Sequence, residues 1–204
     1  MVLQYIILTC AAIFAILGYR NYFKKISSNE IQPNRWSWLI WSFATILETI
    51  TYDAVSEDPI KSIIFYIASV SCVIITIKIW NKSARKKPDD ASEIFSVVMC
   101  LVAVIIWVSF NSAWWAHLVL LVSLPIAFIP TYKDAWKNYK SENCAAWWLW
   151  SIGDLFALLL ILLRFDKAQE VPYAVIEFVC HALVVAIVVM RMRMKMKMVR
   201  VRTQ

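Results

Sequence analysis

The chain has 204 residues and a net charge of +7, with 61% hydrophobic and only 17% charged residues. Soluble domains are about half apolar and about a quarter charged, and a soluble chain of this length could not hide so much apolar surface from water. The composition therefore excludes an ordinary soluble domain and indicates a protein that folds in a lipid bilayer.

Seven apolar runs follow one another along the chain, each about 17–20 residues long and able to cross a roughly 30 Å hydrocarbon layer as a helix. A helix satisfies its backbone hydrogen bonds within the segment, as lipid requires. We therefore predict an all-α integral membrane protein with seven transmembrane helices. The predicted helices are 2–19, 36–52, 60–77, 94–110, 113–129, 145–163 and 171–190.

The first run has an alternative reading as a cleaved signal peptide. No basic residue precedes it and Arg20 follows it, which favours a retained helix. The second run is the most polar, with Glu48 and several Ser and Thr residues. The third run carries Lys61 near its start, and we expect that lysine to reach the membrane interface by snorkelling.

The charges between the runs alternate from one connection to the next. The second connection is acidic, the fourth is uncharged and the sixth is mixed. Basic residues gather in the first, third and fifth connections and in the tail: Arg20, Lys24, Lys25, Arg35; Lys78, Lys82, Arg85, Lys86, Lys87; Lys133, Lys137, Lys140; and Arg191, Arg193, Lys195, Lys197, Arg200, Arg202. The positive-inside rule then predicts an N-terminus outside and a C-terminus in the cytoplasm.

Two segments share the spacing Trp-x-x-Trp-Ser, each with an asparagine four residues before the first tryptophan. A shift of 109 positions, from 38 to 147, superimposes them. The first set is Asn34, Trp38, Trp41 and Ser42, and the second is Asn143, Trp147, Trp150 and Ser151. The paired rings share one helix face. They are interpreted either as an aromatic anchor belt or as part of the wall of a central path.

The repeat predicts two three-helix units joined by the fourth helix. Since three is odd, this linker restores the orientation and makes the units parallel, related by an axis along the membrane normal. The predicted organisation is a first unit at 1–80, a basic loop and linker helix at 81–112, a second unit at 113–190 and a basic tail at 191–204.

Residues 130–133, which read PTYK, and 136–141, which read WKNYKS, resemble the PQ-loop signature, with Thr131 in place of its Gln. In the first unit the matching pair is Leu17 and Gly18, so the motif is absent there. The 3+1+3 layout is similar to that of the SWEET sugar transporters, the lysosomal amino-acid exporters, the KDEL receptor and the nicotinamide riboside transporters. Segments 33–38 and 130–150 resemble uncharacterised bacterial PQ-loop proteins, which implies the bacterial inner membrane.

Four ionisable residues lie inside the predicted membrane spans. They are Glu48, Asp154, Glu177 and His181. A charge at the bilayer centre costs about 2.5–3.5 kcal/mol on insertion scales. We expect Asp154, Glu177 and His181 to line a central cavity that binds a cationic or polar solute or relays a proton. The alternative is a structural hydrogen bond that holds two helices together.

Other residues are expected to frame this path. Trp41 and Trp150 are candidates for its wall. Pro125 and Pro130 are candidate hinges, and Tyr19 and Tyr132 are interface anchors at the ends of the first helix of each unit, with a gate role. We also expect His117 at the outer interface and an Arg164–Asp166 pair at the outer surface, where such a pair stabilises little. These last three residues are not assigned to the solute path.

The sequence predicts facilitated or proton-coupled transport of a small polar metabolite, such as a sugar, an amino acid or a vitamin precursor. The alternative is a non-transporting receptor or adaptor. We expect no cofactor, no metal site and no nucleic acid, anionic lipid contact by the tail 191–202, and either a monomer or a homo-oligomer. Ser151, Asp154 and His181 make a poor hydrolase triad because no nucleophile-elbow motif accompanies them, so no enzyme activity is expected.

Overall fold

The computed structural model describes residues 2–80, 82 and 91–202, the last five of them by their backbone alone. Within this part of the chain there are seven α-helices, two short 3₁₀ helices and no strand, so the all-α prediction is confirmed. The helices are α1 (Val2–Ser27), α2 (Arg35–Ser56), α3 (Pro59–Trp80), α4 (Ala91–Phe110), α5 (Ala113–Lys137), η1 (Tyr139–Ser141), α6 (Cys144–Leu163), η2 (Ala168–Glu170) and α7 (Val171–Arg202).

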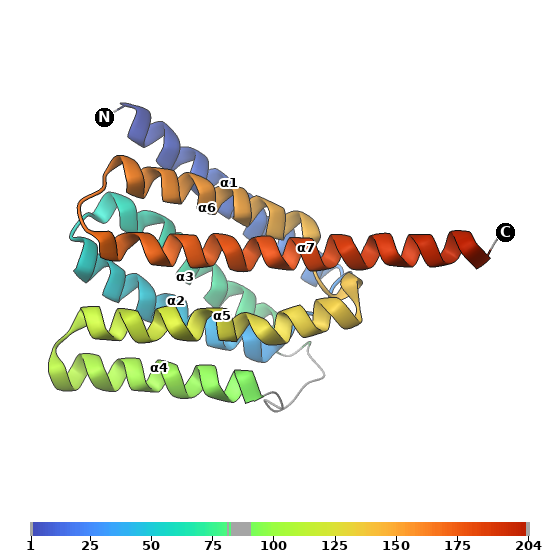
Figure 1. Ribbon diagram of the computed structural model, residues 1–204, viewed down its shortest axis with the longest axis horizontal. Helices are drawn as coiled ribbons and strands as arrows, with labels where there is room; N and C mark the ends of the chain where they lie inside the picture. Colours follow the sequence, from blue (N-terminus) through green and yellow to red (C-terminus); the bar gives the residue numbers. More distant parts are fainter. Residues whose placement is uncertain (1, 81, 83–90, 203–204) are drawn as a thin grey trace.

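The α-helices run side by side in one bundle, and the chain turns back at alternate ends (Figure 1). We call the end where α1, α3, α5 and α7 finish the basic end, since Lys24, Lys78 and Lys137 lie near it. The other end, with the connections at 57–58 and 164–170, is the mixed-charge end. The chain therefore begins at the mixed-charge end and finishes at the basic end. The basic stretch Arg85–Lys87 lies outside the described residues, as does the predicted unit boundary at 81.

Six of the helices in the described part of the chain are long and apolar enough to cross a membrane. Large apolar side chains cover their outer faces: Ile105 and Val108 of α4 are 60% and 79% exposed. Exposing such an apolar surface to water would be unfavourable, whereas contact with the hydrocarbon of a lipid bilayer is favourable. The protein is therefore a multi-pass helical membrane protein.

The helix α2 is the exception, and the prediction of seven apolar spans holds for six. Its polar side chains point inward, among them Ser42, Thr49 and Glu48, all buried. Ser42 Oγ lies 2.7 Å from Thr76 Oγ1 of α3, and Thr49 Oγ1 lies 2.7 Å from Ser69 Oγ. Hydrogen bonds between α2 and α3 thus satisfy hydroxyl groups that would be unfavourable in contact with lipid.

Three helices extend well past the apolar runs. The helix α1 continues beyond Tyr19 to Ser27, α5 passes through Pro130 and ends at Lys137, and α7 continues beyond Met190 to Arg202. Tyr19 and Tyr132 therefore lie inside helices, and the prediction that they end them is wrong. Basic residues in the last turn favour helix continuation because they interact with the C-terminal end of the helix dipole.

The contacts between helices follow the same order in each half of the chain. The helix α3 packs against α1 and α2, and α7 packs against α5 and α6. Between the halves, α1 lies against α6 and α2 lies against α5, while α4 packs on α5 and α2. The α1–α6 and α2–α5 contacts bring four tryptophans of α2 and α6 to the middle of the bundle: Trp38, Trp41, Trp147 and Trp150.

Candidate functional site

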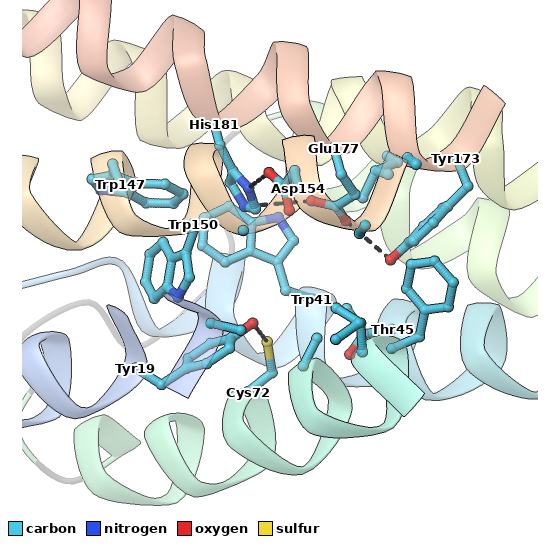
Figure 2. Close-up of a pocket in the computed structure, with 18 of the residues that line it drawn as sticks. Tyr19, Trp41, Thr45, Cys72, Trp147, Trp150, Asp154, Tyr173, Glu177 and His181 are labelled. Carbon is cyan, nitrogen blue, oxygen red and sulfur yellow. Dashed lines mark hydrogen bonds and ion pairs between the residues drawn. The ribbon is translucent and has the colours of Figure 1, made fainter. Parts of the chain in front are cut away.

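A cavity of about 60 Å³ lies at the centre of the bundle. Side chains from α1, α2, α3, α5, α6 and α7 line it, and Figure 2 shows ten of the lining residues by name. The predicted site residues Trp41, Trp150, Asp154, Glu177 and His181 all lie on its wall. A space of this size holds a few water molecules or a very small solute.

Four polar side chains form a connected row on this wall. Nδ1 of His181 lies 2.7 Å from Oδ2 of Asp154, and its Nε2 lies 3.4 Å from Oε2 of Glu177. The hydroxyl of Tyr173 donates to Oε1 of Glu177 over 3.1 Å. One imidazole thus bridges two carboxyl groups from different helices, as Figure 2 shows.

Helical spacing explains why these groups meet. Tyr173, Glu177 and His181 are four residues apart along α7, and Trp150 and Asp154 are four apart along α6, so each set shares one helix face. The packing of α6 on α7 then turns the two faces toward each other. The spacing was readable from the sequence, and the packing of the two helices brings the groups within contact distance.

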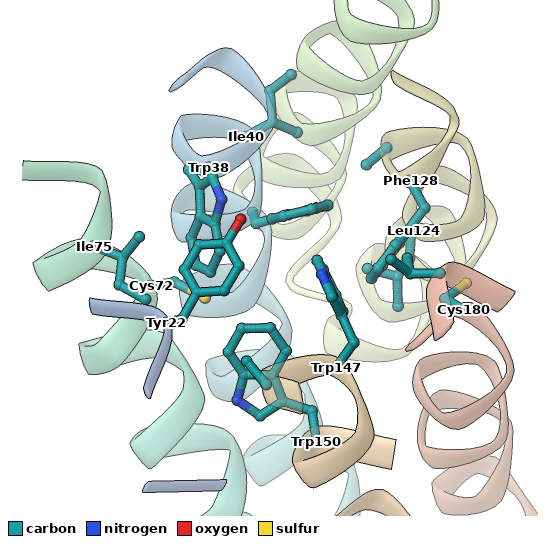
Figure 3. Close-up of a cluster of buried hydrophobic side chains, with 14 of the residues drawn as sticks. Tyr22, Trp38, Ile40, Cys72, Ile75, Leu124, Phe128, Trp147, Trp150 and Cys180 are labelled. Carbon is teal, nitrogen blue, oxygen red and sulfur yellow. The ribbon is translucent and has the colours of Figure 1, made fainter. Parts of the chain in front are cut away.

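An aromatic cluster closes the cavity toward the basic end. It consists of Tyr22, Trp38, Trp41, Phe128, Trp147 and Trp150, all at most 5% exposed (Figure 3). Its rings pack edge to face or tilted, such as Trp147 on Trp150 at 4.8 Å between centroids. We call this set the basic-end aromatic cluster. Its four tryptophans lie inside the bundle. They therefore do not form an anchor belt, whose rings would face the membrane interface.

A second aromatic group closes the cavity toward the mixed-charge end. Tyr52, Phe65 and Tyr173 pack together, with centroids 4.4 Å apart between Tyr52 and Phe65 and 4.8 Å apart between Phe65 and Tyr173. All three side chains are buried. Aromatic rings therefore flank the cavity on both sides, while the side chains of Asp154, Glu177 and His181 remain 13–18% exposed.

A buried carboxyl group lies beneath the basic-end aromatic cluster, outside the helices. Oε2 of Glu142 accepts hydrogen bonds from Tyr22 Oη and Trp147 Nε1, each 2.9 Å long. Burial raises the pKa of Glu142 from 4.5 to about 7, against the lowering effect of these two hydrogen bonds. The connection between η1 and α6 is thereby tied to α1.

Glu48 lies apart from the central cavity. Its Oε1 is 2.7 Å from Nδ1 of His117 on α5, and both side chains are almost fully buried. It lines a small neighbouring cavity together with Thr45 and Tyr173, which also border the central one. The expectation of an interfacial His117 is wrong, because the contact between α2 and α5 buries it.

The predicted hinge and gate residues have different surroundings. Tyr19 lines the cavity, and its hydroxyl lies 3.7 Å from the Cys72 sulfur. The Tyr132 hydroxyl donates to the Cys180 carbonyl over 3.2 Å. Pro125 is exposed and Pro130 is buried, and α5 continues through both. The gate and hinge roles of these four residues stay predictions.

Ion pairs at the mixed-charge end were missed by sequence reasoning. Lys61 Nζ lies 2.6 and 2.8 Å from the two carboxylate oxygens of Glu170, and both side chains are buried, so Lys61 does not snorkel. Arg164 pairs with Asp58 at 2.7 Å rather than with Asp166. Lys167 pairs with Glu57 at 2.8 Å. All three pairs join segment 57–61 to segment 164–170.

The described residues contain no group of three or more His, Cys, Asp or Glu side chains that could hold a metal ion. All five cysteines are free. The residues described above offer hydrogen bonding, ion pairing, proton exchange and aromatic contact at the centre of the bundle.

Comparison of the chain with protein-family models, curated proteins and solved structures gives no match. The PQ-loop resemblance therefore stays a prediction that rests on the short motifs at 33–38 and 130–150.

Proposed function

We propose that this protein carries a small polar solute across a membrane through its central cavity, by facilitated or proton-coupled transport. The observation that carries the proposal is the Asp154–His181–Glu177 row on a cavity wall at the centre of an apolar bundle. Ionisable groups inside a membrane protein are costly and mark substrate or proton paths. An imidazole between two carboxyl groups is suited to exchanging a proton.

The proposed architecture is a 3+1+3 repeat of the PQ-loop and SWEET type. Two sets of helix contacts support it: α1–α3–α2 in the first half and α5–α7–α6 in the second. The contacts between halves also correspond, since α1–α6 becomes α5–α2 when the units are exchanged. The helix α4 packs on the outside of α5, as a linker would. Two such units moving against each other would open the cavity to one side at a time.

The proposed orientation puts the basic end in the cytoplasm of a bacterial inner membrane, with the N-terminus outside. The alternation of charge between the two ends supports it. Beyond the bundle, α7 projects as a helix that carries alternating Met and basic residues (Figure 1). We propose that the basic residues of this projection contact anionic lipid headgroups.

A receptor or adaptor that binds a solute without passing it is the second candidate. The aromatic groups favour it, because they flank the site on both sides in this conformation. A binding protein needs no passage through these rings, whereas a transporter must separate each group in turn.

Uptake by the purified protein in liposomes tests the proposal. A panel of labelled sugars, amino acids, vitamin precursors and small amines is offered with and without an inward proton gradient. We expect uptake by the wild-type protein and its loss in Asp154→Asn, which keeps the size of the side chain and removes its charge. The matched control is Asp166→Asn, since Asp166 is exposed and outside the cavity.

If the Asp154→Asn variant takes up the solute as well as the wild type does, the solute does not pass through the central cavity. If a member of the panel binds but neither the wild type nor the variants take it up, the protein is a receptor and not a transporter.

A further inference from the structure

We propose that the solute bound in the central cavity is a small organic cation that also carries an oxygen able to accept a hydrogen bond. This inference rests on the proposed function, because it names the solute class for the same site. Three independent features of the cavity wall support it: its excess of acidic side chains, its aromatic rings and an unpaired hydrogen-bond donor.

Acidic side chains outnumber basic ones on the wall. Asp154 and Glu177 are the acidic lining residues, and His181 is the sole basic one among the lining side chains. With both carboxyl groups ionised and the imidazole protonated, one carboxylate has no compensating charge within the cavity. A carboxylate held largely away from water is costly without a partner, and a cationic solute would supply the missing charge and favour the ionised form of both groups.

The rings around these carboxyl groups suit a cation with an apolar surface. Trp38, Trp41, Trp147 and Trp150 all line the cavity, and the His181 ring packs 5.3 Å from Trp147 and 5.7 Å from Trp150. The faces of indole rings attract cations, and sites for methylated ammonium groups are built from several such rings. A bare metal ion would prefer a wall of oxygen ligands.

One buried donor on the wall lacks an acceptor. The indole Nε1 of Trp41 has no hydrogen-bond partner among the described residues, and its side chain is only 5% exposed. The Nε1 of Trp150 faces Gly18 of α1 instead. An indole N–H can only donate, and buried donors are seldom left unpaired. A hydroxyl or carbonyl oxygen on the solute would satisfy the Trp41 donor. The small size of the cavity, about 60 Å³, excludes an oligosaccharide or a peptide chain in this conformation.

Choline and its neutral isostere 3,3-dimethylbutan-1-ol test the inference, since the two differ only in the charge of the quaternary centre. Binding to the purified full-length protein is measured by isothermal titration calorimetry. We expect choline to bind at least about tenfold more tightly than the neutral isostere. The variant Asp154→Asn should weaken choline binding at least about tenfold, and Trp41→Phe, which keeps a ring and removes the N–H, should weaken it several-fold.

The matched controls are Asp166→Asn and Trp148→Phe, whose parent side chains are exposed and lie off the cavity wall. Both should bind choline as the wild type does. Equal binding of choline and the isostere, or no binding of choline at all, would overturn the inference. The comparison of the two ligands on the wild-type protein does not depend on the folding of any variant.

The outcomes separate this inference from the transport proposal. If the protein takes up a neutral or anionic solute and choline does not inhibit that uptake, the inference of a cationic solute is wrong, while the transport proposal stands. Choline that binds as expected but does not enter liposomes would support the cation and overturn transport.

Discussion

The paired tryptophans have matching hydrogen bonds in the two halves of the chain. Ser42 Oγ donates to the Trp38 carbonyl over 2.8 Å, and Ser151 Oγ donates to the Trp147 carbonyl over 2.9 Å. Asn34 and Asn143 precede α2 and α6, where each side-chain oxygen accepts a backbone N–H. A serine four residues after the first tryptophan satisfies its own hydroxyl, and the asparagine caps the helix. The repeated spacing therefore has a local structural cause.

Gly18 makes close helix contact possible. A methyl group there would lie 2.5 Å from Nε1 of Trp150, and the ring cannot move freely because Tyr19, Tyr22 and His181 pack around it. We expect Gly18→Ala to lower the free energy of unfolding by about 1–3 kcal/mol. Gly153→Ala is the matched change on α6, where the nearest atom is 3.4 Å away.

The control should be neutral or stabilising by about 0.5–1 kcal/mol, because alanine is the better helix former. Chemical unfolding in detergent checks both variants. Equal stability of the two proteins would contradict the close packing of Gly18 on Trp150.

Glu142 should make stability depend on pH. Its pKa of about 7 in the folded state lies above its usual value of 4.5, so the folded protein binds the proton more tightly than the unfolded chain does. The stabilisation is complete below pH 4.5 and is lost as the pH rises through about 7. We expect the thermal unfolding midpoint to fall between pH 5 and pH 8, and Glu142→Gln to flatten that fall.

The control for Glu142 is Glu30→Gln, which alters an exposed carboxyl group at the same end of the bundle. This control variant should keep the wild-type pH dependence of the unfolding midpoint. If the midpoint of Glu142→Gln falls with pH as much as that of the wild type, a group other than Glu142 causes the pH dependence.

At the scale of the elements, the mixed-charge end is held together by ion pairs between distant segments. The Lys61–Glu170 pair is buried and bidentate and joins the start of α3 to η2. Arg164 and Asp58 add a more exposed pair beside it, in which the hydrogen bond and charge of Arg164 lower the pKa of Asp58 despite the raising effect of partial burial. These contacts link the first half of the chain to the second at the end remote from the tryptophans.

Breaking the buried pair from one side should be costly. Lys61→Met leaves Glu170 without its buried partner. Glu170→Met leaves Lys61 with only the more distant carboxylate of Asp58, 4.0 Å from its Nζ. We expect either single change to lower the free energy of unfolding by about 3–5 kcal/mol, and the double change to recover most of that loss. A double-mutant cycle measured by unfolding in detergent checks this. Additive losses would mean that the two side chains do not act as a pair.

At the scale of the whole molecule, the cavity lies between two aromatic groups. The ion pairs of the mixed-charge end lie beyond the group formed by Tyr52, Phe65 and Tyr173. The helices bring Tyr52, Phe65 and Tyr173 to one side of the Asp154–His181 pair and the basic-end aromatic cluster to the other. The aromatic groups thus flank the central polar side chains along the bundle, while Asp154, Glu177 and His181 each keep 13–18% of their side-chain surface exposed.

The orientation in the membrane is a prediction at the same scale. In a protein without its native cysteines, single cysteines replace Ser28 and Met196 at the basic end and Asp166 at the mixed-charge end, all exposed positions. A membrane-impermeant maleimide added to intact bacteria should label only position 166. Positions 28 and 196 should react after permeabilisation. Labelling of position 28 in intact cells would reverse the predicted orientation.

Much of the candidate site was predictable from the sequence. Glu177 and His181 share a face because they are four residues apart, and Asp154 is conspicuous because it interrupts an apolar run. The tryptophan spacing likewise marked Trp41 and Trp150. The lengths of α1, α5 and α7 were underestimated, because the apolar run ends at the membrane interface while helical hydrogen bonding continues past it.

The sequence by itself determined that the chain is helical and membrane-embedded, since composition and the length of the apolar runs demand it. Only the tertiary structure decided that Lys61 pairs with Glu170, Arg164 with Asp58 and Glu48 with His117. The first two pairs join residues 109 and 106 positions apart. Periodicity tells which face of a helix a residue occupies, but the neighbour of that face is chosen by packing of the whole bundle.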